Sequence, residues 1–560
     1  MAVTKLQAAK SAHVNMMTDT IINNMDPQGL RIIMRSLLAA HPEITSTLEA
    51  ETTRYINDAV LPAISARCSQ PNGAHATITG GPSSLDLFQN DLRTVRCMVG
   101  CGQVLQSLSL LGSLVSQATT LSLQSQNGTS TASSNLDRVL AATGGDVVQT
   151  MTAIEKTLFT SSGSRKLTDD ERSSIRQLYQ PLLESLDKCR ASDKEYPFER
   201  ALIATASLLG EPQPVFEASS ANVSQNGSRQ EVKETFSLNG RALPRIFSGL
   251  WQLSSPAWGS APTTKIIAQF SSHVASGFTA FDMADHYGDA EILVGKFLSS
   301  YPAKGDLFAA TKYCVFHPMT LTREAVEANI SERCRRLQVD RIDLLQFHWQ
   351  FYNDPTYLDA IRYIAEDKRV AALGLCNFDT EHMEKCLQQG VKIHSNQVQF
   401  SLIDSRPVVR MGKVCEANDV KLLTYGTLCG GFLSEKWLDA PEPDLYDEAV
   451  TPSQRKYYGV IRAWGDWSLF QELLRALKAI ATKHAVDISN VATRWVLDFP
   501  YVGAVIVGAR MGISEHTSEN LASFGWSLDQ EDQAAIDAVL AKSRRMEMFE
   551  AMGDCGGEYR

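Results

Sequence analysis

The chain has 560 residues, of which 44% are hydrophobic and 21% charged, and its formal net charge at pH 7 is -10. This length exceeds one ordinary domain, so we expect about two or three domains, and the hydrophobic fraction is typical of a globular protein with a sizeable core. The acidic balance argues against a nucleic-acid partner, and there is no run of about 18 apolar residues that could cross a membrane.

The eleven cysteines are scattered along the chain. Cys97 and Cys101 are the one close pair, and a spacing of four on a helix is more typical of core packing than of a metal site. No second Cys/His pair has the spacing of zinc ligands, and no apolar segment of signal-peptide length follows the N-terminus. We expect reduced thiols, no metal site and a cytoplasmic location.

Residues 1–212 have the pattern of an all-α domain. Asp26-Pro27 is typical of a helix N-cap followed by proline, and Thr168 to Glu171 resembles a capping box. The apolar segment from Val104 to Val115 predicts a central helix or an oligomer contact. We recognise no catalytic constellation here, so self-association or partner docking is the expected role. An enzymatic role for this region remains an alternative.

Residues 213–232 are rich in Ser, Asn and Gln, which predicts a flexible linker. Asn239-Gly240 follows between two short apolar runs, and this dipeptide is the strongest local signal for a β-hairpin. We therefore predict a helical domain at 1–212, a linker at 213–232 and a second domain at 233–560.

The second domain alternates strand-like and helix-like segments, such as the predicted helices Arg323–Leu337 and Glu381–Gln389. Eight strands are predicted, at Ile246–Leu250, Ala280–Asp282, Leu307–Thr311, Ile342–Phe347, Ala371–Leu375, Ser395–Phe400, Lys421–Tyr425 and Ala504–Val507. Eight such repeats favour a (β/α)8 barrel, and the absence of a Gly-x-Gly-x-x-Gly motif disfavours a Rossmann domain.

The carboxyl ends of barrel strands meet on one face, where barrel enzymes carry their active sites. The residues at or just beyond these predicted ends are Asp282, Tyr287, Lys312, His348, Cys376, Asn377 and Tyr425, with Asn396-Gln397 opening the sixth strand. This ordered set resembles the aldo-keto reductase superfamily over residues 233 to about 550. The matching motifs are Gly277-Phe278, Asp282-x-Ala284-x-x-Tyr287-Gly288, Lys312, His348-Trp349, Gly374-x-x-Asn377-Phe378, Asn396-Gln397-Val398-Gln399, and Gly508-Ala509-Arg510 with Glu519-Asn520-Leu521.

The resemblance implies the reduction of an aldehyde or ketone by hydride from NADPH, and the residue types suit that chemistry. The developing alkoxide needs a proton, which Tyr287 can donate if a nearby ammonium, Lys312, favours its ionisation. Asp282 would hold Lys312. His348 would orient the carbonyl and donate to its oxygen.

The resemblance also implies a cofactor site. Asn377 and Gln397 would bind the nicotinamide carboxamide and Tyr425 would stack on the ring, although Tyr425 could equally be a core aromatic. Cys376 stands where the family commonly has serine, which weakens one polar contact. The remaining candidates are Gly426, Leu428, Gly430 and Gly431 near the pyrophosphate, then Gly508, Arg510, His516, Glu519 and Asn520.

Arg510 is the best candidate for the ribose 2′-phosphate, because a guanidinium matches phosphate geometry. This favours NADPH over NADH, although the last motif is longer than in many members and His516 stands where others have Arg or Gln. Trp251, Trp258 and Trp349 on the loops favour a large apolar or aromatic carbonyl substrate, or else they pack on the barrel rim.

An alternative hypothesis is that the protein is a non-catalytic, cofactor-sensing regulatory or scaffold protein whose helical domain binds a partner. The complete set of Asp282, Tyr287, Lys312 and His348 argues against it. Asp285 and His286, inside the first motif, have no role in this scheme.

Overall fold

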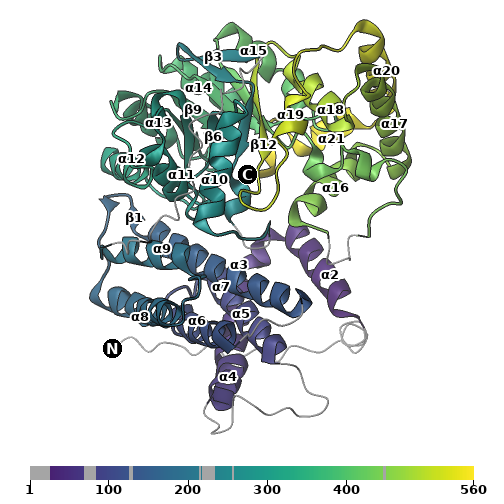
Figure 1. The fold of residues 1–560 in the computed structure, drawn as a ribbon. Coiled ribbons are helices and arrows are strands. Elements are labelled where there is room, and N and C mark those ends of the chain that lie inside the picture. The colour runs from purple at the N-terminus through teal and green to yellow at the C-terminus, as the bar shows by residue number, and fades with distance from the viewer. Residues whose placement is uncertain are drawn as a thin grey trace, which may run out of the picture.

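The computed structural model describes residues 25–68, 84–124, 130–212, 216, 234–254, 258–444 and 450–559. They form a helical region, residues 25–212, and a barrel region, residues 234–559 (Figure 1). The predicted linker at 213–232 lies outside the described residues except for Phe216, whose ring stacks on Tyr196 of the helical region. The predicted domain boundaries therefore stay a prediction.

The helical region consists of long helices with one small hairpin near its end. Its elements are α2 (Pro27–Ala40), α3 (Thr45–Tyr55), α4 (Leu61–Cys68), α5 (Ser84–Gly100), α6 (Ser107–Gln124), α7 (Ser130–Thr157), β1 (Phe159–Thr160), β2 (Gly163–Ser164), α8 (Asp169–Ala191) and α9 (Glu199–Leu209). This confirms the predicted helical class. Both predicted helix starts are present: the Asp26 carboxylate caps α2, and Thr168 and Glu171 form a capping box on α8.

The predicted apolar segment becomes α6, the central helix of this region. Leu108, Leu111, Leu114 and Val115 on α6 are completely buried. Gly112 lets α6 approach α8 closely, because a Cβ at this position would lie 2.9 Å from the backbone oxygen of Gln177. The segment therefore forms the core of the helical region, which is one of the two predicted alternatives.

The barrel region is a closed barrel of eight parallel strands, which confirms the predicted fold class. The strands, in their order around the barrel, are β5 (Ile246–Gly249), β6 (Ala280–Asp282), β7 (Phe308–Cys314), β8 (Leu344–His348), β9 (Leu373–Cys376), β10 (Ser395–Gln399), β11 (Lys421–Tyr425) and β12 (Val502–Gly508).

Helices follow every strand and form the outer layer. One helix follows each of the first six strands: α10 (Thr263–Ala275), α11 (Ala290–Ser300), α12 (Arg323–Leu337), α13 (Thr356–Glu366), α14 (Thr380–Gln388) and α15 (Met411–Ala417). Three follow β11 and three follow β12: α16 (Pro452–Trp464), α17 (Trp467–His484), α18 (Ile488–Leu497), α19 (Thr517–Leu521), α20 (Gln530–Leu540) and α21 (Arg545–Met552).

The third barrel strand is longer than its sequence predicts. The prediction ended it at Thr311, but β7 continues because Tyr313 and Cys314 pair with Phe347 and His348 of β8. Lys312 therefore lies inside the strand rather than just after it. A charged residue can occupy that position only because the barrel interior supplies a counter-ion.

The predicted hairpin is present as β3 (Thr235–Leu238) and β4 (Arg241–Pro244). Asn239 and Gly240 both have positive φ, as a tight two-residue turn requires. Leu238 and Leu243 pack beneath the barrel interior in one cluster with Phe247 and Phe308. The hairpin therefore closes the end of the barrel from which the strands begin.

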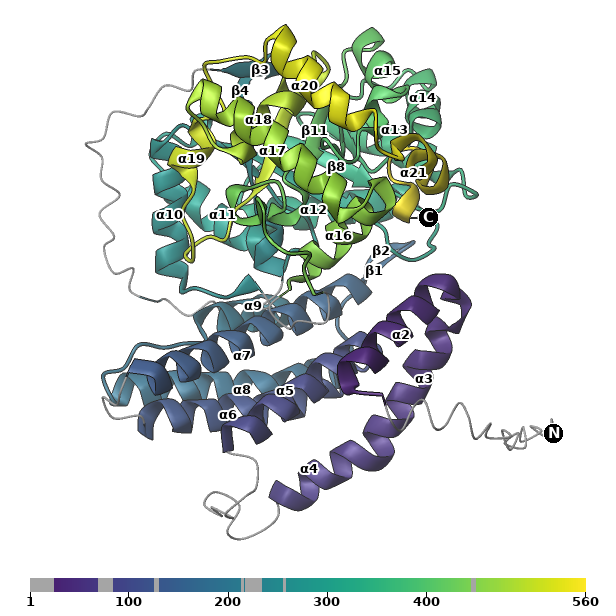
Figure 2. The ribbon, with the colours of Figure 1, turned by 90° about the vertical axis from the view of Figure 1, so that its right-hand side faces the viewer.

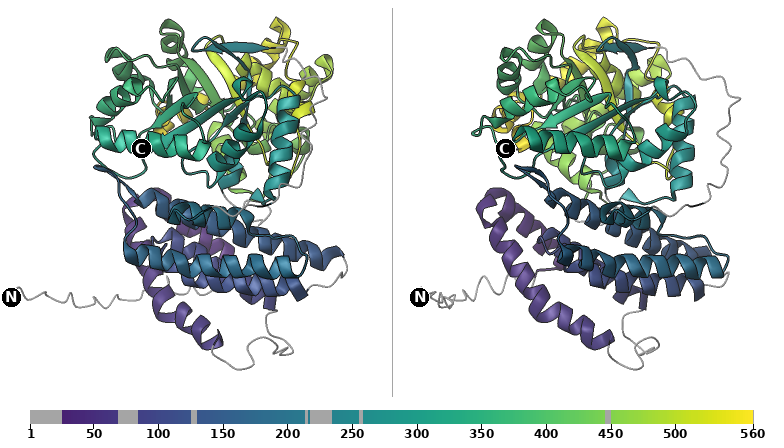
Figure 3. Two further views of the ribbon diagram at one scale, coloured as in Figure 1. Left: turned by 60° about the vertical axis from the view of Figure 1, so that its left-hand side comes forward. Right: turned by 90° about the vertical axis from the view of Figure 1, so that its left-hand side faces the viewer.

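The helical region lies against the opposite end of the barrel, the end to which the strands point (Figure 1). α7 and α9 are next to the barrel, and α5, α6 and α8 lie beyond them (Figure 2). The same two layers are seen from the other side in Figure 3. Among the described residues, no helix combines the length and the apolar character needed to cross a membrane.

Candidate active site

Asp282 and Lys312 form a buried ion pair at the centre of the barrel. The Lys312 ammonium donates to Asp282 Oδ2 at 2.7 Å and to the Met283 carbonyl at 2.9 Å, and the lysine is 2% exposed. Burial disfavours the charged lysine, but Asp282 and Tyr287 outweigh this, so the pKa of Lys312 lies above its usual value. Lys312 is therefore an ammonium at neutral pH, and Asp282 accepts its hydrogen bond.

Tyr287 lies in the turn after β6 with its ring near this ammonium. The distance from Lys312 Nζ to the centre of the Tyr287 ring is 4.9 Å. Burial raises the pKa of the Tyr287 phenol above its usual value, while the charge of Lys312 acts in the opposite direction. Lys312 therefore lowers the pKa of Tyr287, as expected of a nearby ammonium, but burial raises this pKa by more. Tyr287 is a protonated phenol at neutral pH.

His348 ends β8 beside these residues and is 4% exposed. The rings of Phe316 and Tyr559 meet its imidazole edge-on, each at 5.5 Å between ring centres. The structure therefore brings all four predicted catalytic residues, from three consecutive strands, to one end of the barrel.

Two glutamine side chains complete the surroundings of Asp282. Gln346 and Gln397 donate to Asp282 Oδ1 at 2.9 and 2.8 Å, and Gln397 also donates to Gln346 at 2.8 Å. The predicted contact of Gln397 with a nicotinamide carboxamide stays a prediction. In this structure the Gln397 amide lies against the carboxylate that holds Lys312.

Asn377 and Tyr425, both predicted to contact nicotinamide, lie side by side. The Tyr425 hydroxyl donates to Asn377 Oδ1 at 3.0 Å, and Asn377 has a positive φ of 56°, a region that asparagine tolerates well. Burial raises the pKa of the neighbouring Cys376 thiol to about 12, with Lys312 opposing it. Cys376 is therefore an uncharged thiol at this strand end.

The predicted pyrophosphate turn follows β11 and includes Gly426, Leu428, Gly430 and Gly431. All three glycines have positive φ. A Cβ on Gly426 would lie 2.3 Å from the Tyr457 hydroxyl, whereas one on Gly431 would meet no atom within 4 Å. Gly426 is thus required for packing, and Gly431 leaves its backbone open to a ligand.

Four of the residues predicted after β12 share one cavity, which is lined by Gly508, Arg510, His516 and Asn520. Arg510 Nε donates to the Trp258 carbonyl at 3.0 Å, and the His516 imidazole pairs with Glu519. A guanidinium, an imidazole and an amide around one cavity are donors suited to phosphate oxygens. These residues fit the phosphate end of a nicotinamide dinucleotide.

The three predicted tryptophans occupy different environments. Trp251 and Trp258 are neighbours, with ring centres 5.3 Å apart, and Trp251 is 41% exposed. Trp349 is only 1% exposed and stacks with Phe347 and Tyr357. The alternative of rim packing therefore describes Trp349, whereas Trp251 is exposed and Trp258 is half-buried.

A family model described as the aldo/keto reductase family matches residues 245–541, more than half of the chain. The protein belongs to the aldo/keto reductase family. It is therefore an oxidoreductase of carbonyl compounds that uses a nicotinamide cofactor. The match lies within the barrel region, so the helical region is an addition to the part that defines this aldo/keto reductase.

Two curated relatives and one solved structure illustrate the similarity. The chain is 28% identical over 313 residues to aldo-keto reductase YhdN of Bacillus subtilis, covering 53% of this chain and 89% of the relative. It is 22% identical over 322 residues to the NADH-specific methylglyoxal reductase of Escherichia coli, covering 52% and 92%. The glycerol dehydrogenase AKR11B4 from Gluconobacter oxydans matches 56% of this chain and 97% of its own, with 24% identity and a TM-score of 0.46.

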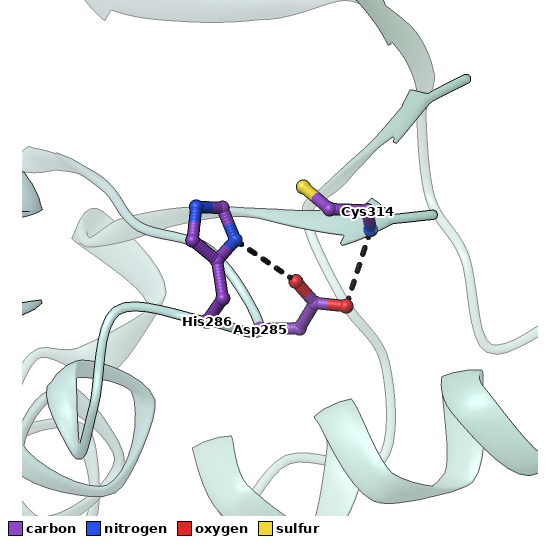
Figure 4. A group of neighbouring side chains, drawn as sticks. All are labelled: Asp285, His286 and Cys314. Atoms are coloured by element: carbon purple, nitrogen blue, oxygen red, sulfur yellow. Dashed lines mark hydrogen bonds and ion pairs between the residues drawn. The ribbon is translucent and has the colours of Figure 1, made fainter. Parts of the chain in front are cut away.

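Asp285 and His286 of this aldo/keto reductase have no role predicted from the sequence, and the structure shows which groups they contact. Asp285 accepts hydrogen bonds from His286 Nδ1 at 3.3 Å and from the Cys314 backbone N–H at 3.1 Å (Figure 4). Lys156, on α7 of the helical region, donates to the same carboxylate. This contact joins residues 129 apart in the sequence, and no local motif indicates it.

Asp285, His286 and Cys314 are also the group of potential metal ligands found among the described residues. The carboxylate, however, is already paired with Lys156, and burial raises the pKa of the Cys314 thiol well above its usual value. A protonated thiol is a poor ligand. The group is therefore best explained as an ion-pair cluster at the contact between the two regions.

The C-terminal segment, residues 553–559, is a second feature that sequence reasoning missed. Arg406 donates to the carbonyl oxygen of Asp554 at 3.1 Å and to Glu558 at 3.0 Å, which fixes the segment on the barrel. The Tyr559 hydroxyl lies 3.1 Å from the Tyr425 hydroxyl, and the same ring contacts His348. This segment therefore places the Tyr559 ring beside His348 and Tyr425.

Proposed function

We propose that the protein reduces an aldehyde or ketone to the alcohol, with NADPH as the hydride donor and Tyr287 as the proton donor. The observation that carries this proposal is the arrangement around Lys312. Its ammonium is bonded to Asp282 at 2.7 Å and stands 4.9 Å from the centre of the Tyr287 ring, with His348 at the end of the next strand.

Each of these residues has a distinct role in the proposed reaction. Tyr287 donates the phenol proton to the carbonyl oxygen as negative charge develops there. Lys312 stabilises the phenolate that remains, and Asp282 keeps Lys312 charged and in place. His348 donates a hydrogen bond to the same carbonyl oxygen and orients it.

The cofactor proposal depends on the residues after β11 and β12. NADPH supplies the hydride when bound. Arg510 binds the 2′-phosphate, His516 and Asn520 lie around the same cavity, and the open backbone at Gly431 approaches the pyrophosphate. Asn377 and Tyr425 are proposed to hold the nicotinamide. NADPH is favoured over NADH because the Arg510 guanidinium matches a phosphate that NADH lacks.

The proposed substrate is a carbonyl compound with a large apolar or aromatic substituent. Phe316, 44% exposed, stands beside His348, and Trp251, 41% exposed, stands on the same face. Exposed aromatic rings near the proposed carbonyl site favour an apolar ligand over a small sugar.

The test is the Tyr287→Phe variant, assayed for NADPH consumption with a panel of aldehydes and ketones and for NADPH binding by fluorescence titration. We expect turnover to be lost while binding remains. Tyr363→Phe, on α13, is the matched control and should behave as the wild type. Full turnover by Tyr287→Phe would refute the assignment of the acid. Binding without consumption by the wild type would favour the non-catalytic alternative.

A further inference from the structure

The turn that carries Tyr287 is held on both sides by the helical region. Two residues before Tyr287, the Asp285 carboxylate accepts a hydrogen bond from Lys156 of α7. Two residues after it, the Asp289 carboxylate accepts two parallel bonds from Arg200 of α9, one of them 2.7 Å long from Nε. Tyr287 therefore sits between two ion pairs that both cross to the helical region.

Asp285 connects the first of these ion pairs to the catalytic strand. Its side chain is fully buried, and it accepts the Cys314 backbone N–H at 3.1 Å, two residues beyond Lys312 on β7. Burial opposes ionisation of this carboxyl group, but the charge of Lys156, the hydrogen bond from His286 and the charge of Arg333 outweigh it. The pKa of Asp285 therefore lies well below its usual value. Lys156 is the closest cation, since Arg333 stands 3.6 Å away.

We propose that Lys156 is a positioning residue for the catalytic Tyr287, so that the active site of this reductase is completed by its helical region. Lys156 holds the Asp285 carboxylate in the position where it accepts the Cys314 N–H, and this fixes the short backbone segment between Asp282 and Tyr287. The phenol is thereby held over the Lys312 ammonium. Lys156 itself touches no reacting atom. The inference rests on the proposed function.

A further ion pair between the two regions touches neither Asp285 nor Tyr287, which allows a matched control. Lys296, on helix α11 of the barrel, pairs with Glu199 of α9 at 3.8 Å. Lys296→Met removes one lysine–carboxylate ion pair between the helical region and the barrel, but leaves Asp285 and its contacts intact. A purely structural role of the Lys156 pair instead predicts a loss of folded protein, with kcat per NADPH-binding site unchanged.

The experiment compares full-length Lys156→Met, Lys156→Arg and Lys296→Met by kcat and KM for an aldehyde that the wild type reduces, and by fluorescence titration with NADPH. We expect kcat of Lys156→Met to fall by about 10- to 100-fold, the cost of a small displacement of a catalytic group. NADPH affinity should stay within about twofold, because the proposed cofactor residues are untouched. Lys156→Arg should recover most of the loss, and Lys296→Met should match the wild type.

A double variant covers the case in which Lys156→Met alone does not fold. Lys156→Met combined with Asp285→Asn leaves no unpaired buried carboxylate, so it should fold and bind NADPH but still turn over slowly. Wild-type kcat in either folded variant would overturn the inference. A fall in kcat that is fully explained by a smaller fraction of protein able to bind NADPH would overturn it too, because the remaining molecules would then turn over normally. A wild type that reduces no carbonyl would instead reject the proposed function, and this inference with it.

Discussion

Gln397, on β10, donates its side-chain amide to Asp282, on β6, across the interior of the barrel, with 2.8 Å between the two atoms. Because Gln346 and Lys312 bind the same carboxylate, Asp282 is the centre of a polar network in which every member depends on the others. Such a network is stable only while it is complete.

The first prediction concerns the loss of one charge from this network. Lys312→Met leaves Asp282 buried without its cation, so we expect the free energy of unfolding to fall by about 3–5 kcal/mol. Adding Asp282→Asn removes the unpaired charge and should restore part of the stability. Urea unfolding followed by tryptophan fluorescence measures both. A double variant less stable than the single one would contradict this account.

The second prediction concerns the pH dependence of carbonyl reduction. Burial holds the pKa of Tyr287 above its usual value, and a proton donor is active in its protonated form, so a raised pKa moves the loss of activity to higher pH. We expect the reduction rate to stay level from about pH 6 to about pH 9. Alcohol oxidation needs the phenolate and should rise with pH over the same range. A fall in the reduction rate with a midpoint below about pH 9 would show that another group donates the proton.

The third prediction concerns cofactor choice. Arg510→Met removes the guanidinium proposed to bind the 2′-phosphate, so KM for NADPH should rise by about tenfold or more, the value of one charge-assisted hydrogen bond. KM for NADH should change little. Steady-state kinetics with both cofactors provides the measurement, and His516→Ala, in the same cavity, is a useful comparison. Equal effects on the two cofactors would place Arg510 away from the phosphate.

The fourth prediction concerns Tyr559, whose ring lies against His348. Tyr559→Ala should raise KM for aromatic ketones by about tenfold, because one aromatic wall beside the carbonyl site is lost. Tyr559→Phe keeps the ring and removes the hydroxyl contact with Tyr425, and it should stay close to the wild type. Kinetics with an aromatic and an aliphatic carbonyl compound would test this. An equal rise in KM for Tyr559→Phe and Tyr559→Ala would show that the hydroxyl, and not the ring, is responsible.

Local chemistry explains what could be predicted from the sequence. The capping residues Asp26 and Thr168 act within their own helices, and the strands Ala280–Asp282 and Lys421–Tyr425 begin and end as predicted. Strand ends converge in any barrel, so the order of Asp282, Lys312 and His348 was enough to predict their meeting.

Contacts between distant segments explain what could not be predicted. Strand β7 continues past Thr311 because its last residues pair with β8, and the apolar run in the sequence does not show this pairing. Lys156 is an ordinary helix residue in the sequence, and its partner Asp285 lies 129 residues further on. Tyr559 likewise stands 134 residues from Tyr425. None of these pairs has a fixed spacing that a motif could express.

The ion pairs of Asp285 and Asp289 also limit how freely this barrel could be exchanged for that of a relative. A transplanted barrel with neutral residues at these two places would leave Lys156 and Arg200 against the new surface as cations without counter-ions, which is costly for the largely buried Arg200. The cost of these unpaired cations also disfavours the assembly of this helical region with barrels from other proteins. Chimeras of the two regions should therefore assemble well only when the two carboxylates are carried over together.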